Sequence, residues 1–500
     1  MKVLVTGGTG VVGKVAVDQL LEHGHSVRLL SRHADRDGRQ WAAGVEPWAG
    51  SVGNDDSIRG AAAGCDAVLH IAGIVRESPP EVTFEQVNVE GMRRILREAE
   101  RARVRRFVFV SSMGADQGAS DYHRSKYAAE KLVAQSELDW LVVRPGNVYG
   151  PGDEVISLLL KMVRTLPAVP VVGSGDQPFQ PVWAGDLAEA LVRALERTEP
   201  SRQMLDLAGP EVTSMNDLLD LLEKITQRSP VRIPVPEWLA RSGAGAMESL
   251  GLDLPVNSSQ LTMLVEENVI PPGRKNALTE VFGVQPTRLA EGIAKLADSL
   301  LEQLPTEGVG SLHQQRYWAD VRGSRLDADA LFEMARNEFG TLAPDGLLEV
   351  GAEPGTQKGR LEEGDTLTMA IPMRGTIQVR VRDIRERTMT SVTLEGHPLS
   401  GVIQFKVEDR GDLLRFEIRS YTRASDLVDL VGMRTVGRVA QQVTWQSVVQ
   451  EVVRRSGGEA VEGVQSDSAT LDEEKAERIE RWVEELVTEK KREENPGTGE

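Results

Sequence analysis

Hydrophobic and polar positions divide the chain into regions with different periodicities. In the first region, apolar runs alternate with helical stretches such as 84–102, and each run suits a strand buried on both faces. The runs lie at 26–30, 67–71, 106–110 and 139–143. Alternating strands and helices predict a doubly wound α/β fold, in which helices cover both faces of a parallel sheet.

Alternation at period two replaces this pattern after about residue 314. A short strand (316–321) and a helix near 327–338 precede four closely spaced segments that alternate apolar and polar residues, at 376–384, 389–396, 401–409 and 413–421. Arg410-Gly411-Asp412 predicts a hairpin turn between the last two. A long amphipathic helix (434–454) follows, and a curved antiparallel sheet gripping it is the simplest way to bury both surfaces.

These changes of pattern predict the domain boundaries. Residues 1–302 form the α/β domain, and its small helical cap comes largely from 200–302, a mostly helical stretch with a strand near 203–207 and proline-rich connectors. A linker at 303–313 leads to an α+β domain at 314–456. An acidic link and an amphipathic helix make up 457–500.

The C-terminal helix carries one apolar stripe on an otherwise charged surface. Thr470 and Glu473 resemble a capping box at its start. The stripe consists of Ile479, Trp482, Val483, Leu486 and Val487. We expect it to pack back onto its own protein, and contact with another chain is the alternative.

Composition and charge narrow the function classes. A net charge of −18 over 500 residues argues against non-specific nucleic-acid binding and against docking on anionic lipid. No apolar run is long enough to cross a bilayer, and a strand beginning at residue 2 predicts no leader peptide. Cys65 is the only cysteine and is interpreted as a packing residue, so no disulfide and no metal site are predicted. We expect a cytoplasmic protein.

A glycine-rich turn joins the first apolar strand to a helix. Gly7, Gly10 and Gly13 recur at three-residue spacing, and Gly8 fills the turn. Without side chains there, a pyrophosphate can approach main-chain N–H groups at the start of the helix, whose dipole favours an anion. This strand–turn–helix context favours dinucleotide binding over an ordinary tight turn.

Tyr122 and Lys126 are the second feature that points to chemistry. Four residues apart on a helix, they share a face, and an ammonium near a phenol lowers the pKa of the phenol. Tyr122 is therefore a candidate acid or base for a carbonyl/alcohol couple, although a surface pair is the alternative. Ser111 and Ser112 end the preceding strand, and Ser112 is the candidate for positioning a substrate oxygen. Both hydroxyls could instead only satisfy backbone groups.

With these motifs the sequence resembles the short-chain dehydrogenase/reductase superfamily, in its extended and atypical branches. The resemblance rests on TGGTGVVG (6–13), LHIAG (69–73), VNVEG (87–91), FVSSMGA (109–115), Tyr122xxxLys126 and RPGNVYGPGD (144–153), and continues more loosely to about residue 300. It implies that Tyr122 is the catalytic acid/base, Lys126 its helper and a ribose contact, and Ser112 the polarising hydroxyl. The cofactor-binding set that we predict is Gly7, Gly8, Thr9, Gly10, Val11, Val12, Gly13, Ser31, Arg32, Ala72, Gly73, Asn88, Lys126, Pro145 and Gly146.

Two further resemblances bear on function. FQPVWAGDLAEAL (179–191) and FGVQPTRLAEGIAKL (282–296) are similar to the branch that contains the NADPH-binding accessory subunit of respiratory complex I. Some members of that branch bind nucleotide to stabilise an assembly. Residues 314–456 resemble a poorly characterised bacterial and plant family, and their layout looks like the helix-grip fold of StART-type ligand binders. A cavity for an apolar molecule and a filled core both fit that layout, and His397 is read as a turn-capping residue rather than a ligand.

The end of the second strand bears on the choice of cofactor. An acidic residue there would bind the ribose 2′-OH of NAD, whereas this chain has Ser31 and Arg32, which suit a 2′-phosphate. We therefore predict NADP(H), with NAD(H) as the alternative and a solvated Arg32 as the simpler interpretation. Ser51 stands where the family often has an acidic adenine contact.

The sequence thus predicts an NADP(H)-binding oxidoreductase that acts on a carbonyl or secondary alcohol, with epimerase or dehydratase chemistry as variants. The predicted partner is a small-molecule substrate, which could be apolar. A protein partner could bind the C-terminal domain or helix. A non-catalytic NADPH-binding assembly or regulatory protein is the alternative. A lipid carrier without redox chemistry is the third hypothesis.

Overall fold

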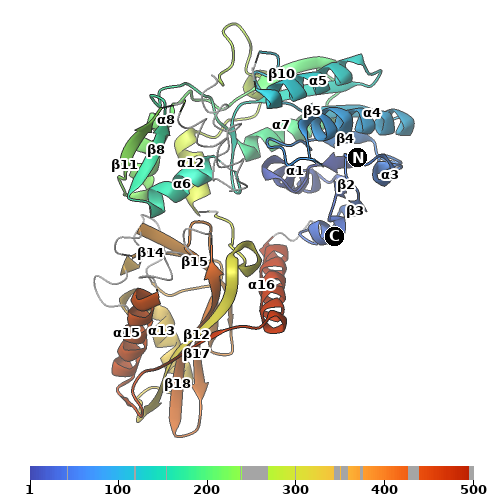
Figure 1. Cartoon of the computed structure of the whole chain (residues 1–500). Coiled ribbons are helices and arrows are strands. Elements are labelled where there is room, and N and C mark those ends of the chain that lie inside the picture. Colours follow the sequence, from blue (N-terminus) through green and yellow to red (C-terminus); the bar gives the residue numbers. More distant parts are fainter. Residues whose placement is uncertain are drawn as a thin grey trace.

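Figure 1 shows a computed structural model of the whole chain. The structure describes residues 1–41, 43–80, 82–117, 120–153, 155–236, 238, 268–298, 300–342, 349–350, 359–371, 375–425 and 438–494. An upper α/β part contains the N-terminus, and a lower part contains the antiparallel strands and the last long helices.

A seven-stranded parallel sheet forms the centre of the upper part. Its order is β10-β6-β5-β4-β1-β2-β3, so the chain reverses direction across the sheet between β1 and β4. The strands are β1 (Lys2–Thr6), β2 (Ser26–Ser31), β3 (Val45–Ala49), β4 (Ala67–His70), β5 (Arg106–Val110), β6 (Trp140–Pro145) and β10 (Gln203–Leu207). All of their pairings are parallel, and the predicted strands and fold class are confirmed.

Helices cover both faces of this sheet because side chains alternate along each strand. Val3 and Val5 face a core shared with α1 (Val11–Glu22), α7 (Ala184–Glu196) and α11 (Ala277–Glu280). Leu4 faces the other core, which contains α3 (Asp55–Ile58), α4 (Glu90–Ala102) and α5 (Asp121–Gln135). The predicted helix 84–102 begins with a π-helical turn, η1 (Glu85–Val89).

A smaller lobe lies beside the carboxyl-terminal edge of the sheet. One apolar core joins α6 (Ile156–Thr165), α8 (Met215–Thr226) and α12 (Leu289–Asp298) to β8 (Ala168–Val172). The connector that we expected near 229–238 instead forms β11 (Val231–Val235), which pairs with β8 and tolerates Pro234 because this sheet has only edge strands. The predicted cap, 200–302, differs from the observed lobe in two ways. Its strand β10 belongs to the large sheet, and the lobe also includes part of 155–172.

Short elements complete the upper part. Helix α2 (Ala34–Gly38) follows β2, and β7 (Val148–Tyr149) pairs with β9 (Val182–Trp183). Because β6 and α7 belong to the large-sheet part while Tyr149 of β7 and Trp183 of β9 pack in the core of the smaller lobe, this pairing connects the two lobes.

The lower part is an antiparallel sheet in the order β13-β14-β15-β16-β17-β18-β12-β19, with β20 also paired to β12. Its strands are β12 (Val309–Arg322), β13 (Glu349–Val350), β14 (Thr366–Ile371), β15 (Gly375–Arg385), β16 (Thr388–Thr393), β17 (Leu399–Asp409), β18 (Leu413–Ala424), β19 (Glu459–Ala460) and β20 (Gln465–Thr470). The four period-two segments therefore form β15 to β18. Gly411, with φ of +82°, turns the predicted hairpin between β17 and β18.

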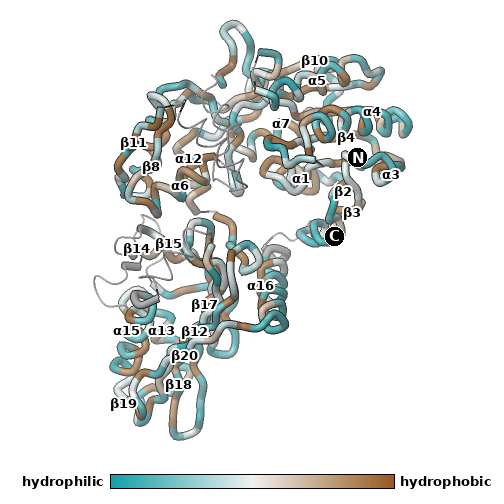
Figure 2. The backbone as a smooth tube through the Cα atoms, in the orientation of Figure 1, coloured by the Kyte–Doolittle hydropathy of each residue, from teal (hydrophilic) through white to brown (hydrophobic). Residues whose placement is uncertain are grey.

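Helices lie on both faces of the antiparallel sheet. On one face, α13 (Ala328–Asn337) and α15 (Arg438–Ser456) share a core that includes Phe405 and Val449. On the other face, α16 (Glu473–Glu494) buries Val483 and Val487 against β16 to β18. Hydrophilic and hydrophobic residues alternate along α16 in Figure 2. The prediction that its stripe packs on its own protein is confirmed.

Three expectations about the connecting segments are wrong, the first two because of backbone pairing that is not encoded locally. Residues 309–313 belong to β12, which pairs with β18, so the expected linker is shorter than 303–313. Within the expected acidic link, 465–470 form β20 on the other edge of β12. Asp472, rather than Thr470, caps α16 by accepting a hydrogen bond from the Lys475 N–H at 3.0 Å.

Backbone hydrogen bonds attach the lower sheet to the upper part. The Gln303 N–H donates to the Thr393 carbonyl at 2.7 Å, and the Glu395 N–H donates to the Leu301 carbonyl at 2.9 Å. Leu394 is buried in the core of the smaller lobe, and β15 contacts α6. The end of β16 is therefore part of the contact between the two parts. Among the described helices, none is long and apolar enough to cross a membrane.

Candidate active site

A cleft of about 1340 Å³ opens at the carboxyl ends of the parallel strands. It is lined by residues that follow β1, β2, β4, β5 and β6, the edge at which ligands bind in open α/β sheets. The reversal of strand order between β1 and β4 leaves room for a ligand there, because the two following chain segments diverge.

Most of the predicted site residues line this one cleft. They are Gly7, Thr9, Gly10, Val11, Val12, Ser31, Arg32, Ala72, Gly73, Ser112, Tyr122, Lys126, Pro145 and Gly146. Gly8, Gly13 and Asn88 are not among the lining residues, and they lie behind it.

The glycine turn fits a pyrophosphate. Gly7 has φ of +73°, and a Cβ there would lie 2.6 Å from the Ala72 nitrogen. A Cβ on Gly13 would lie 2.0 Å from the Gly7 carbonyl oxygen, so side chains at both positions are excluded. Helix α1 starts at Val11 after Gly10, which has no side-chain cap. Its first N–H groups therefore face the cleft without competition from a capping side chain.

The end of β2 contains more charged groups than the sequence pattern suggested. Ser31 donates its hydroxyl hydrogen to the buried Asp37, and its oxygen accepts from the His33 N–H at 3.2 Å. The hydroxyl hydrogen of Ser31 is therefore already donated to Asp37. Arg36, which the sequence analysis did not single out, lines the cleft together with Arg32 and forms an ion pair with Asp37.

Tyr122 and Ser112 meet at the floor of the cleft through a side-chain hydrogen bond. Burial raises the pKa of Tyr122 to about 12, and the bond to Ser112 opposes that rise. The prediction that Lys126 lowers the pKa of Tyr122 is wrong, because the pKa is raised. Desolvation of the phenolate dominates, and the phenol is protonated at neutral pH.

Lys126 lines the cleft and is held by neighbours from β5, from α5 itself and from the loop after β4. Its Nζ donates to the Val110 carbonyl at 2.9 Å and lies 4.9 Å from the centre of the Phe109 ring. Burial lowers its pKa to about 8, and the carboxylate of Glu130 opposes this. Gly73 leaves room for this side chain, since a Cβ there would lie 3.1 Å from Nζ.

Asn88 connects the active-site helix to the loop after β4. Its Nδ2 donates to Ser125 Oγ at 2.9 Å and to the Ile74 carbonyl at 3.1 Å, while its Oδ1 accepts from the Ile74 N–H at 2.9 Å. Ser125 belongs to α5, between Tyr122 and Lys126. Asn88 is thus in a position to orient that helix.

A buried ion pair that the sequence analysis missed anchors the same helix from the other side. Arg144, at the end of β6, contacts Glu130 of α5 through Nε at 2.8 Å and Nη2 at 2.6 Å. Glu130 is 0% exposed and Arg144 is 5% exposed. Nothing in the local sequence links the two residues, so only the paired strand and helix reveal the contact.

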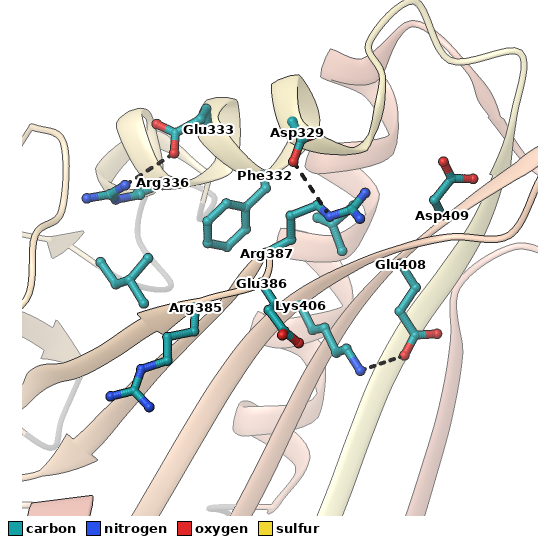
Figure 3. Close-up of a pocket in the computed structure, with 12 residues that line it drawn as sticks. Asp329, Phe332, Glu333, Arg336, Arg385, Glu386, Arg387, Lys406, Glu408 and Asp409 are labelled. Carbon is teal, nitrogen blue, oxygen red and sulfur yellow. Dashed lines mark hydrogen bonds and ion pairs between the residues drawn. The ribbon is translucent and has the colours of Figure 1, made fainter.

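A second hollow of about 740 Å³ lies between α13 and strands β15 to β17 (Figure 3). Six of its charged side chains form three ion pairs: Arg336 with Glu333, Arg387 with Asp329, and Lys406 with Glu408. His397 lies elsewhere, where its Nδ1 accepts a hydrogen bond from the Leu399 N–H, as expected of a turn-capping residue. The candidate chemistry is therefore concentrated in the larger cleft.

The strand order and the glycine turn at the switch point place the chain among Rossmann-like proteins that hold a dinucleotide at the sheet edge. Residues 3–207 match the sequence model of the NAD dependent epimerase/dehydratase family, and the chain belongs to this family. Residues 329–451 match a second model, a domain of unknown function (DUF1990).

Curated relatives have diverse names. Sterol demethylase protein B of Methylococcus capsulatus is 30% identical over 261 residues, which cover 48% of this chain and 79% of the relative. A ketoreductase of Stigmatella aurantiaca, named for a farnesyl dihydroquinoline oxide, is 27% identical and covers 50% and 80%. NADH dehydrogenase [ubiquinone] 1 alpha subcomplex subunit 9 of Arabidopsis thaliana is 26% identical and covers 53% and 68%. The chain is thus similar both to reductases and to a respiratory-complex subunit.

Proposed function

We propose that the protein is an NADP(H)-dependent oxidoreductase that interconverts a carbonyl group and a secondary alcohol. The observation that carries this proposal is the placement of Ser112, Tyr122 and Lys126 in one cleft with the glycine turn. The glycine turn, Ala72 and Gly73 would hold the dinucleotide, with Pro145 and Gly146 along its nicotinamide side. A bound reduced dinucleotide supplies the hydride.

Each of the three side chains has a distinct role in this reaction. Tyr122 donates its hydroxyl proton to the carbonyl oxygen during reduction and accepts a proton from the alcohol during oxidation. Ser112, hydrogen-bonded to Tyr122, donates to the same substrate oxygen. Lys126 supplies a nearby positive charge, which favours the phenolate that Tyr122 becomes after giving up its proton.

The direct test is turnover. Purified protein is incubated with NADPH and a panel of ketones and aldehydes, and the loss of NADPH absorbance is followed. Oxidation of NADPH that depends on one class of carbonyl supports the proposal. Bound dinucleotide that raises the melting temperature without turnover of any carbonyl supports instead the non-catalytic assembly role, which the similarity to the complex I subunit favours.

The pKa of Tyr122 predicts different pH dependences for the two directions. With a pKa raised to about 12, the phenol stays protonated between about pH 6 and pH 7, where Lys126, with a pKa of about 8, still carries its charge, so the rate of reduction should be nearly flat. Oxidation requires the phenolate, whose fraction grows about tenfold per pH unit in this range. Initial rates in both directions at saturating substrate test this, and a rate of oxidation independent of pH would contradict it.

Replacing Arg32 with glutamate tests the choice of cofactor. Loss of a guanidinium–phosphate contact and the added like charge should weaken NADPH binding by about tenfold or more, with a much smaller effect on NADH. Dissociation constants for both dinucleotides provide the measurement. Arg39→Glu is the matched control, because Arg39 is exposed and is not among the residues that line the cleft. Equal losses for NADPH and NADH in Arg32→Glu would favour a solvated Arg32.

The helix-grip interpretation of the C-terminal domain also remains a proposal. It is supported by the long helix α15 packed on one face of the antiparallel sheet. On that face Trp445 and Val449 contribute to an apolar core, so any ligand of this domain would have to bind elsewhere on it or at its edge.

A further inference from the structure

The part of the cleft at the end of β2 would receive the adenosine ribose of a dinucleotide. Ser31 is the last residue of β2, and Arg32, Arg36 and Asp37 follow it and line the same part of the cleft. In Rossmann-like sites an acidic side chain binds the ribose 2′-hydroxyl of NAD, whereas an arginine accommodates the 2′-phosphate of NADP. Both kinds of side chain are present here, so their contacts decide what this part of the cleft can bind.

Asp37 brings a buried carboxylate back to the end of β2. It belongs to α2, six residues after Ser31, and its side chain is 8% exposed. Its Oδ2 accepts the hydroxyl hydrogen of Ser31, and its Oδ1 accepts a hydrogen bond from Arg36 Nη2 at 3.2 Å. The carboxylate is thus held directly beside the strand end, although the strand end itself carries a serine.

The hydrogen bond between Ser31 and Asp37 determines what these two residues offer to a ligand. Because the Ser31 hydroxyl donates its hydrogen to Asp37, that hydrogen is not directed at a phosphate. Each carboxylate oxygen of Asp37 has a second lone pair and can accept one more hydrogen bond. A ribose 2′-hydroxyl can donate that bond. A 2′-phosphate is an acceptor with the same sign of charge as Asp37 and is repelled.

Other charged groups around this part of the cleft leave the two roles separate. Lys14 and Asp18 lie one turn apart on α1 and have opposite charges. Arg36 forms an ion pair with Asp37. Arg32 is exposed and lines the cleft, so it is the cation best placed for a 2′-phosphate, while Asp37 is the acceptor at the strand end.

We propose that Asp37 is a specificity-determining residue that keeps the dinucleotide site open to NAD(H) as well as to NADP(H). Its carboxylate would accept a hydrogen bond from the adenosine 2′-hydroxyl of NAD(H). The same negative charge would reduce the advantage that Arg32 gives to the 2′-phosphate of NADP(H). The inference rests on the dinucleotide binding of the proposed function, and it requires no turnover.

Dissociation constants of NADPH and NADH for the wild-type chain and for Asp37→Asn test the inference. The substitution keeps the shape of the side chain and removes its charge. We expect NADH to bind about tenfold more weakly, because a hydrogen bond to a charged acceptor becomes one to a neutral acceptor. NADPH should bind equally well or more tightly. An unchanged NADH constant, or a ratio of the two constants that changes by less than about threefold, would overturn the inference.

Asp35→Asn is the matched control for this substitution. Asp35 lies on α2 with Asp37, but it is exposed and is not among the residues that line the cleft. Water and salt screen its charge, so both dissociation constants should stay within about twofold of their wild-type values. Thermal unfolding of both variants establishes that they are folded before their constants are compared.

An NADH analogue that lacks the adenosine 2′-hydroxyl tests the wild-type protein directly, whatever the stability of Asp37→Asn. If Asp37 accepts a hydrogen bond from that hydroxyl, the analogue should bind about tenfold more weakly than NADH. The difference between the two ligands should shrink in Asp37→Asn, because the hydroxyl then meets a neutral partner. Equal binding of the analogue and of NADH by the wild-type protein would overturn the inference.

Binding and turnover together separate this inference from the proposed function. If neither dinucleotide binds the wild-type protein, the proposed function and the inference both fail. If both dinucleotides bind and Asp37→Asn leaves their ratio unchanged, only the inference fails. The expected change of ratio without turnover of any carbonyl would defeat the proposed reaction and leave the role of Asp37 standing.

Discussion

Replacing Tyr122 with phenylalanine is expected to lower kcat for carbonyl reduction by about 10²–10⁴-fold, the range that a positioned general acid contributes. The substitution removes one oxygen from a side chain that lines the cleft beside Ser112 and leaves the ring contacts with Phe84 and His123 in place. Affinity for the dinucleotide should therefore stay near its wild-type value. Steady-state kinetics and a binding titration together measure the two effects.

Tyr127→Phe provides the control for this experiment. Tyr127 belongs to the same helix, but its ring lies under Lys131 Nζ at 4.1 Å and is not among the residues that line the cleft. Its loss should leave kcat within about twofold of wild type, since surface substitutions away from a site have small effects. Unchanged turnover in Tyr122→Phe would remove Tyr122 from the chemistry.

Local sequence patterns predict the sheet and much of the cleft because their causes are local. A glycine turn that follows a strand and begins a helix has the same backbone requirements wherever it occurs, and the Cβ positions at Gly7 and Gly13 show why. Tyr122 and Lys126 share a helix face through their spacing alone. Parallel strands then bring the ends of β1, β4 and β5 to one edge, where these residues meet.

The remaining features depend on contacts between distant segments, which no local pattern specifies. The expected pKa of Tyr122 failed because spacing reveals a nearby lysine but not the burial that outweighs it. Strand β20 forms because the edge of β12 has unpaired backbone groups, although its own sequence is polar except at Ala469. Arg380 reaches the cleft only because the C-terminal domain is held against Leu301 and Gln303.

Replacing Arg144 with methionine is expected to have the largest effect on stability. The substitution leaves Glu130, which is 0% exposed, without the guanidinium that holds both of its oxygens. Breaking a buried pair by removing one partner costs about 3–5 kcal/mol of the free energy of unfolding. For a unit of this size we expect the melting temperature to fall by about 6 °C or more. Thermal unfolding of the full chain provides the measurement.

The matched control is Arg124→Met, on the helix that carries Glu130. Arg124 pairs with Asp121, but the two side chains are 60% and 74% exposed, so water replaces the lost contact and the melting temperature should change little.

The double variant Arg144→Met/Glu130→Leu should recover most of the lost stability, because the cost comes from the uncompensated carboxylate and not from the missing cation. A single variant as stable as wild type would mean that Glu130 finds another proton or partner. Recovery in the double variant would show that the uncompensated carboxylate of Glu130, and not the loss of the ion pair itself, destabilises the single variant.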